Sequence, residues 1–142
     1  MHDKVKTVEV DGAQYEVRRM TPAVGSYIWQ KLMAACYKAG ESAKDSTQPE
    51  EGRVEKLLPT PTAEERLRAL CGVAFMFMDF ETFLFVQASA MKVLSRHEGP
   101  AGFIPVMTDD GRWSVNELSD SPMLVTRLAV EALVFNLHSF LA

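Results

Sequence analysis

The sequence predicts a mostly α-helical chain with a small β element, in which an N-terminal β-hairpin is followed by a bundle of three to five helices. Near the start, an Asp-Gly pair separates two short runs in which apolar and polar residues alternate, as in a hairpin. Further along, three stretches carry apolar residues at helical spacing, each after a capping signal. The 142 residues suit a single domain, residues 1–142.

The predicted hairpin covers residues 6–19. Valine and tyrosine alternate with polar residues on both sides of Asp11 and Gly12. A two-residue hairpin turn needs positive φ at both central positions, which Asp-Gly tolerates. We therefore expect two antiparallel strands joined at this pair.

A first helix is predicted over residues 22–38. Thr21 is a typical N-cap, proline at position 22 suits the first helical position, and Gly40 is expected to follow the end of the helix. Residues 40–61 are rich in polar side chains and proline and have few apolar ones. We therefore predict a flexible linker there.

The next helical region is predicted over residues 62–97. Thr62 and Glu65 have the spacing of a capping box, which marks a helix start. A helix reaching His97 would be far longer than is usual. We expect a helix or a broken helix pair, with Gly72 or Asp79 as the point of the break.

Two further elements complete the predicted fold. Residues 103–115 read as a short hairpin or structured loop with a turn at Asp110-Gly111, and Pro105 would confine its strand to the edge of a sheet. A C-terminal helix is predicted over residues 122–141, after a run of capping residues.

The C-terminal helix has one polar face and one apolar face. Arg127 and Glu131 are four residues apart and are expected to pair on the solvent side. Asn136 falls on the opposite, apolar side, where its amide must be hydrogen-bonded, for example to a neighbouring helix end or to loop backbone. We expect Asn136→Leu to cost little stability and Asn136→Asp to cost several-fold more.

Composition and charge exclude several classes of protein. The net charge of −4 speaks against broad nucleic-acid binding, which needs a basic surface. The most apolar stretch, residues 73–86, is interrupted by two carboxylates and is too short to span a membrane. Cys36 and Cys71 are predicted to be buried thiols rather than a disulfide. We therefore expect a cytoplasmic protein that binds neither nucleic acid nor membrane.

No residue pattern predicts catalysis, a cofactor or a metal. The three histidines, His2, His97 and His138, are far apart and lack ligand spacing. The Asp109-Asp110 pair lacks the alternating acidic positions of a calcium loop and is expected to be a turn. Glycines are scattered, and no phosphate-binding or nucleophile motif occurs. A non-enzymatic role without cofactor or metal is the expectation.

Aromatic and methionine residues gather in the middle of the chain. Five of the eight phenylalanines lie within eleven positions, and two methionines lie among them. A helix that is apolar nearly all round must be covered on several faces, either by the core of the domain or by a partner or second copy. The candidate partner-binding residues are Phe75, Met76, Phe77, Met78, Phe80, Phe83 and Phe85.

Two motifs at opposite ends of the chain carry a family resemblance. Residues 10–22 read VDGAQYEVRRMTP and lead from a hairpin into a helix, and residues 131–141 read EALVFNLHSFL. Together they resemble the tail assembly chaperones of long-tailed bacteriophages, whose hairpin reads G-x-x-Y-x-[VI]-R-x-[LM]-T and whose last helix often reads E-A-L-x-x-N-x-x-x-F. The family motif often ends in two phenylalanines, whereas Leu141 follows Phe140 here.

The resemblance implies a non-enzymatic chaperone that binds the tape-measure protein, a long helical chain, and keeps it soluble until tail-tube subunits polymerise around it. The tail-tube protein is a second implied partner, and a homo-oligomer is a further option. The resemblance also implies a location in the host cytoplasm, absence from the mature virion, and a longer product made by frameshifting. A virion structural or tail-completion subunit, a small helical interaction adaptor and a small helical enzyme are the alternatives.

Overall fold

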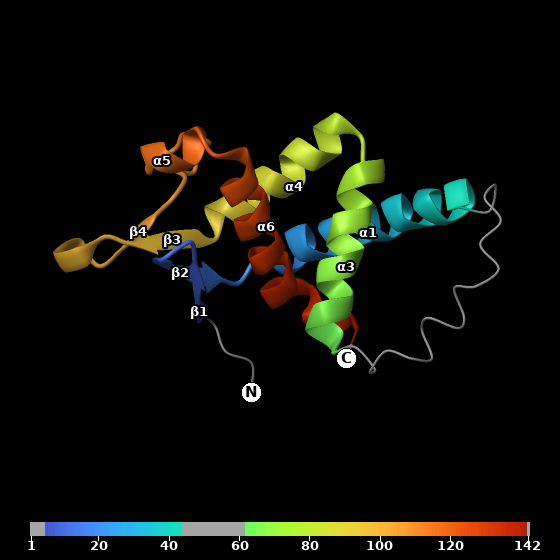
Figure 1. Ribbon diagram of the computed structural model, residues 1–142, viewed down its shortest axis with the longest axis horizontal. Helices are drawn as coiled ribbons and strands as arrows, with labels where there is room; N and C mark the ends of the chain where they lie inside the picture. The colour runs from blue at the N-terminus through green and yellow to red at the C-terminus, as the bar shows by residue number, and fades with distance from the viewer. Residues whose placement is uncertain (1–4, 44–61, 142) are drawn as a thin grey trace.

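The computed structural model describes residues 5–43 and 62–141 and has a sheet at one end and a group of helices at the other (Figure 1). The C-terminal helix α6 (Pro122–Leu137) runs between these two parts. A mostly helical chain that begins with a β-hairpin is therefore confirmed. Most of the predicted linker, residues 44–61, lies outside the described residues.

The β part is a four-stranded antiparallel sheet, larger than the small element that was predicted. The first two strands form the predicted hairpin, and its turn residues Asp11 and Gly12 have φ values of 51° and 80°. Positive φ at both positions is what the Asp-Gly pair supplies. In spatial order, the strands are β1 (Val5–Val10), β2 (Ala13–Arg18), β3 (Leu94–His97) and β4 (Phe103–Pro105).

The prediction that helix continues to His97 is wrong. The chain leaves the helix at Val93 and enters β3, which pairs with the free edge of β2, with Val17 opposite Leu94. These residues form a strand rather than a continued helix because strand pairing buries Leu94 and Ser95 in the sheet. Pro105 lies in the edge strand, as predicted, but its strand pairs with β3 rather than with residues 113–115.

After β4, the chain makes the predicted Asp-Gly turn. Met107 and Trp113 form an isolated bridge across it, and Gly111 has a φ of 89°. Asp110 accepts hydrogen bonds from the Arg112 guanidinium. The Asp110 side chain thus stabilises the turn. Two short helical segments flank this region, η1 (Gly99–Ala101) and α5 (Asn116–Ser119).

Helix α1 (Pro22–Ala43) starts as predicted but is longer than the predicted 22–38. The Thr21 hydroxyl accepts a hydrogen bond from the backbone N–H of Val24, which caps the helix. Gly40 lies inside the helix and not after its end. A glycine inside a helix costs only about 1 kcal/mol relative to alanine, so it does not stop a helix by itself.

The region predicted as a helix or broken pair is a pair. Helix α3 (Ala63–Phe77) begins at its N-cap Thr62, whose side chain accepts from the Glu65 N–H. Helix α4 (Phe80–Lys92) follows its N-cap Asp79, which is one of the two predicted break points. Gly72, the other candidate, lies within α3.

Helix α6 supplies side chains to both hydrophobic clusters of the fold. Leu128 packs with residues of the sheet, whereas Leu133 packs with residues of α1 and α3. After α6, a short 3-10 helix η2 (His138–Phe140) completes the predicted C-terminal segment. By length and composition, Pro122–Phe140 would suffice to cross a membrane, but a central core helix has the same character.

The polar residues of α6 bind other elements of the fold. The predicted Arg127–Glu131 pair does not form: Arg127 pairs with Asp11 of the hairpin turn at 2.6 Å, and Glu131 with Arg68 of α3 at 2.9 Å. Ion pairing to oppositely charged groups on neighbouring elements replaces the weak pair along the helix. Both contacts hold α6 against its neighbours.

Asn136 is hydrogen-bonded to loop backbone, one of the options expected from the sequence. Its side-chain oxygen accepts from the Met20 N–H at 2.7 Å, and its amide nitrogen donates to the Arg18 carbonyl at 3.1 Å and to the Ala132 carbonyl at 2.9 Å. The residue therefore fastens α6 to the segment that joins β2 to α1.

Candidate partner-binding groove

The corner between α3 and α4 divides the Phe/Met segment into two parts. Met78 and Asp79 are extended, and the Asp79 carboxylate accepts from the Thr82 N–H at 3.0 Å and from the Thr82 hydroxyl at 2.7 Å. These bonds from Thr82 lower the pKa of Asp79, with a smaller contribution from the positive charge of Lys31. Asp79 is therefore a capping residue, and the segment is not one helix apolar on all sides.

The corner gives the seven predicted partner-binding residues different environments. Phe75 and Phe83 meet edge to face, with ring centroids 5.3 Å apart, and are half-buried. Met76 and Phe80 are exposed, at 80% and 72%. The remaining three, Phe77, Met78 and Phe85, line hollows beside α1.

A groove lies between α1 and α4, because each of these helices packs mainly on another helix. Helix α1 packs on α3 and helix α4 packs on α6. The aromatic contact between them is that of Tyr27 with Phe85, whose ring centroids are 4.9 Å apart at 72°. This aromatic bridge divides the space between the helices into two hollows. We call the two hollows with this bridge the α1–α4 groove.

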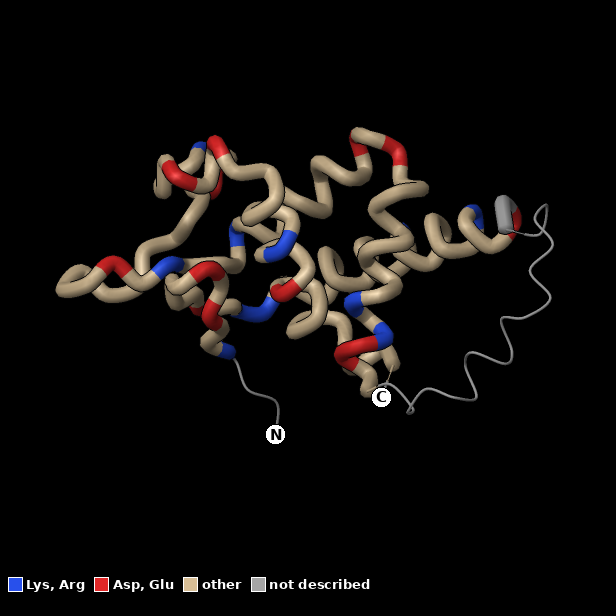
Figure 2. Tube along the Cα trace, viewed as in Figure 1, with Lys and Arg blue, Asp and Glu red and all other residues tan. Residues whose placement is uncertain are grey.

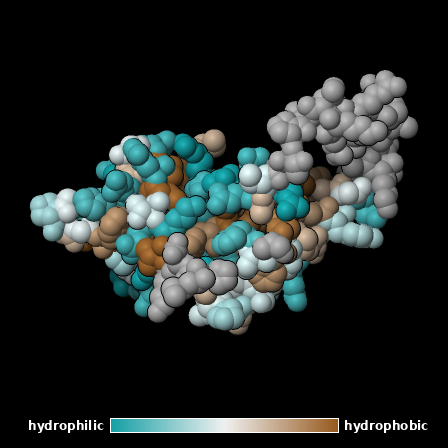
Figure 3. Space-filling model, turned by 90° about the horizontal axis from the view of Figure 1, so that it is seen from below, coloured by the Kyte–Doolittle hydropathy of each residue, from teal (hydrophilic) through white to brown (hydrophobic). Residues whose placement is uncertain are grey.

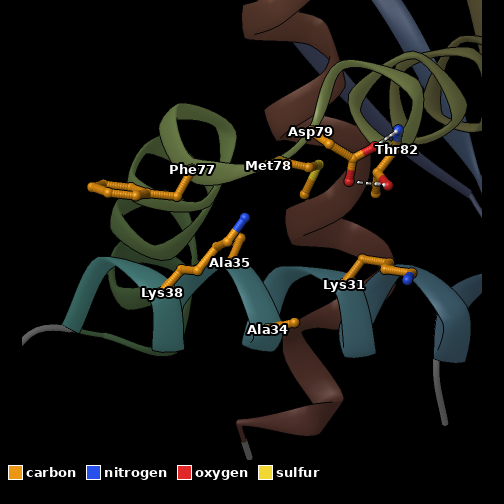
Figure 4. A pocket seen from close by; sticks show the side chains of 8 residues that line it. All are labelled: Lys31, Ala34, Ala35, Lys38, Phe77, Met78, Asp79 and Thr82. Atoms are coloured by element: carbon orange, nitrogen blue, oxygen red, sulfur yellow. Dashed lines mark hydrogen bonds between the residues drawn. The ribbon is translucent and has the colours of Figure 1, made fainter. Parts of the chain in front are cut away.

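The first hollow lies at the α3–α4 corner and has a volume of about 300 Å³ (Figure 4). Its floor includes the small side chains of α1, and its wall is formed by the last residues of α3. In Figure 4 the amino group of Lys38 points from α1 toward the side of Phe77 and Met78. The lining residues are Lys31, Ala34, Ala35, Lys38, Phe77, Met78, Asp79 and Thr82.

The second hollow lies at the other end of the groove and also has a volume of about 300 Å³. It joins the start of α1 to the last turns of α4, so the two helices run antiparallel along the groove. The lining residues are Arg19, Met20, Thr21, Val24, Phe85, Ser89, Lys92 and Val93.

Positive charges border both hollows, while the walls between them are apolar. The Lys31 amino group lies 5.4 Å from the centroid of the Tyr27 ring, a cation–π contact that holds it beside the aromatic bridge. Figure 2 shows charged residues at the start of α3 and at the corner, and few along α3 between these two points. In the view of Figure 3, hydrophobic residues reach the surface in separate patches between hydrophilic ones.

The two cysteines lie where α1 meets α3, away from the groove. Both are free thiols; Cys71 is fully buried, and Cys36 is half-buried and directs its sulfur to the Leu70 carbonyl at 3.6 Å. Burial raises the pKa of Cys71 to about 12 and also raises the pKa of Cys36. Thiols with raised pKa values are poor nucleophiles at neutral pH.

The histidines stay apart in the structure. His97 ends strand β3, and its ring meets that of Phe103 edge to face. His138 follows α6, and its Nδ1 lies 3.1 Å from the Phe135 carbonyl oxygen. Within residues 5–43 and 62–141, no three histidine, cysteine or acidic residues are placed to hold a metal ion.

Sequence reasoning missed the α1 wall of the groove. Val24, Tyr27, Lys31, Ala34 and Lys38 alternate at three- and four-residue spacing, which places them on one stripe of α1. That stripe was visible in the sequence, but a mixed stripe of apolar, small and basic residues does not show what covers it. Comparisons of the chain with family models, with curated proteins and with solved structures gave no match.

Proposed function

We propose that this chain is a non-enzymatic tail assembly chaperone of a long-tailed bacteriophage that binds the tape-measure protein. The observation that carries the proposal is the α1–α4 groove, which consists of two hollows lined largely by apolar residues on either side of the Tyr27–Phe85 contact. Grooves of this form suit an amphipathic helix laid along them. The motifs at the two ends of the chain, which resemble the chaperone family, are the reason for proposing the tape-measure protein as the client.

A client helix can bind in the groove without being deeply buried. Apolar side chains of a client helix would enter the two hollows, and Met78 and Phe85 supply adaptable or aromatic contact area there. Because both hollows are open to the surface, a bound helix can leave when tail-tube subunits replace the chaperone. A chaperone of this kind acts in the host cytoplasm and is absent from the mature virion.

Co-expression with the tape-measure protein of the same phage tests the proposal. The expected result is that the tape-measure protein is soluble and co-purifies with this chain, and that it aggregates when expressed alone. A tape-measure protein whose solubility is the same with and without the chain would contradict the proposal.

Mass spectrometry of purified virions separates the proposed chaperone from a virion structural or tail-completion subunit. The proposal predicts that peptides of this chain are absent from virions and present in the lysate of infected cells. Peptides recovered at the copy number of a tail component would instead identify a structural subunit.

A further inference from the structure

The charges of the α1–α4 groove have a pattern that selects among helical clients. Lys31 and Lys38 border the hollow at the corner, and Lys92 borders the hollow at the other end. The one carboxylate in either lining, that of Asp79, is held by the cap of α4. The groove therefore presents apolar surface with a lysine at each end and a third, Lys31, beside the aromatic bridge.

Two of these amino groups form no ion pair with a carboxylate in the described part of the chain. Lys31 contacts the Tyr27 ring, and its charge contributes to the lowered pKa of Asp79 in the same hollow; Lys38 has neither an ion pair nor a hydrogen bond with a described residue. Lysines elsewhere can be paired: Lys6 of β1 lies 3.7 Å from a Glu64 carboxylate oxygen. Unpaired cations on both sides of an apolar hollow are complementary to carboxylates on an incoming chain.

The length of the walls sets the length of the occupant. Val24 and Lys38 are fourteen positions apart on α1, which corresponds to roughly 21 Å of helix. Asp79 and Lys92 span about 20 Å along α4. A helix of about four turns, or roughly fourteen residues, matches both walls.

We propose that the α1–α4 groove binds one acidic amphipathic helix of about four turns. Its apolar stripe fills the hollows on either side of the Tyr27–Phe85 bridge, and carboxylates along its polar flanks meet Lys38 at one end, Lys31 beside the bridge and Lys92 at the other end. The inference rests on the proposed function only in that the client is a helix. It adds the site on this chain and the charge that the client must carry.

Two synthetic peptides of eighteen residues test the inference directly. Both carry the same leucine stripe at helical spacing, and the flanking positions are glutamate in one and lysine in the other. Binding to the full chain is followed by fluorescence anisotropy at low and high salt. The acidic peptide is expected to bind at least tenfold more tightly than the basic one, and the difference is expected to shrink at high salt. Equal binding of the two peptides, or tighter binding of the basic one, would overturn the inference.

Charge reversal on α1 locates the site. The double variant Lys31→Glu with Lys38→Glu is expected to bind the acidic peptide at least tenfold more weakly than the parent does, and to bind the basic peptide more tightly. Arg66→Glu, an exposed change at the start of α3, is the matched control and is expected to change binding less than twofold. Unchanged affinity in the double variant would overturn the inference. If circular dichroism shows that this variant is unfolded, Lys31→Gln with Lys38→Gln replaces it, with a weakening of the acidic peptide expected.

The outcomes for the inference and for the proposed function are separable. A tape-measure protein that binds equally well to the parent and to the double variant would leave the chaperone proposal standing and refute the groove as its charged site. An acidic peptide that binds as expected, together with a tape-measure protein that does not bind at all, would do the reverse. Self-association that blocks the acidic peptide, measured by sedimentation, would show that a second copy occupies the groove and would overturn the inference.

Discussion

The two long sides of helix α1 are covered to very different degrees. Toward α3 it presents Ile28 and Leu32, both of which are buried against apolar residues of the neighbouring helices. Toward α4 it presents Tyr27, which is 40% exposed, and Ala34, which is exposed. The closed side stabilises the fold, whereas the open side is the part available to a partner. Substitutions on the two sides should therefore affect different measurements.

The largest loss of stability is expected on the closed side. Leu32 has no exposed surface, so Leu32→Ala should lower the free energy of unfolding by about 2–5 kcal/mol through lost burial and a residual cavity. Tyr27→Ala on the open side should cost roughly 1 kcal/mol, mainly the edge-to-face contact with Phe85. Urea unfolding of both variants measures the difference. Equal losses would show that the two sides are packed alike.

The next largest loss of stability is expected for substitutions of Asn136, because its hydrogen-bond partners are backbone groups. The sequence suggested that Asn136→Leu would cost little, on the assumption that the amide and its partner are lost together. The Met20 N–H and the Arg18 carbonyl remain after the change, however, and lose their partner. We expect a loss of about 1–3 kcal/mol.

Asn136→Asp is the companion variant to Asn136→Leu. It keeps the acceptor for the Met20 N–H but turns a carboxylate toward the Arg18 carbonyl, so it should also destabilise. Chemical denaturation of both variants is the measurement. A midpoint unchanged from the parent in either variant would contradict this account of the residue.

A pH dependence is expected from Cys71 on the closed side. Burial raises its pKa from 9.0 to about 12, so the folded chain keeps the proton at a pH where the unfolded chain has lost it. The contribution of the Cys71 thiol to folding stability is therefore fully present below pH 9 and is lost as the pH rises toward 12. The loss should reach about 1.4 kcal/mol at pH 10.

The Cys71→Ala variant isolates this pH dependence. Unfolding is measured at pH 7.5 and pH 10, and the parent should lose more stability over this interval than the variant, which has no thiol to titrate. Identical losses would mean that water reaches Cys71 and that the closed side is not sealed.

The smallest effect on stability is expected at the exposed residues of the corner. Phe80→Ser and Met76→Ser remove side chains that are mostly exposed, so each should change the free energy of unfolding by less than about 0.5 kcal/mol. Thermal unfolding checks this. A loss of several kcal/mol would show that the corner belongs to the core, as one reading of the sequence allowed.

Local signals predicted the elements well, and long-range pairing explains what they missed. The Asp11-Gly12 turn, the Thr62 cap and the break at Asp79 depend on residues close in sequence, and all three are present. Strand β3 was missed because its partner β2 lies more than seventy positions away, and helical spacing continues up to it. The local sequence pattern gives no information about the pairing of β3 with β2.

The groove was only half predictable for a related reason. The Phe/Met segment indicated surplus apolar surface, and Met76 and Phe80 are indeed exposed. Which of its residues face α1 depends on the corner at Asp79, because the corner changes the direction of every side chain after it. The contribution of Tyr27 and Lys31 from α1 required the packing of helices far apart in sequence.

The most direct test of the open side compares two phenylalanines of equal exposure. Phe85 in the groove is 44% exposed and contacts Tyr27, and Phe140 after α6 is 45% exposed and stacks on Trp29. Affinity for a tape-measure fragment is measured by calorimetry for the parent, Phe85→Ser and Phe140→Ser. We predict at least a tenfold loss for Phe85→Ser and less than a twofold change for Phe140→Ser. Equal losses in the two variants, or a loss confined to Phe140→Ser, would contradict the assignment of the α1–α4 groove as the binding site.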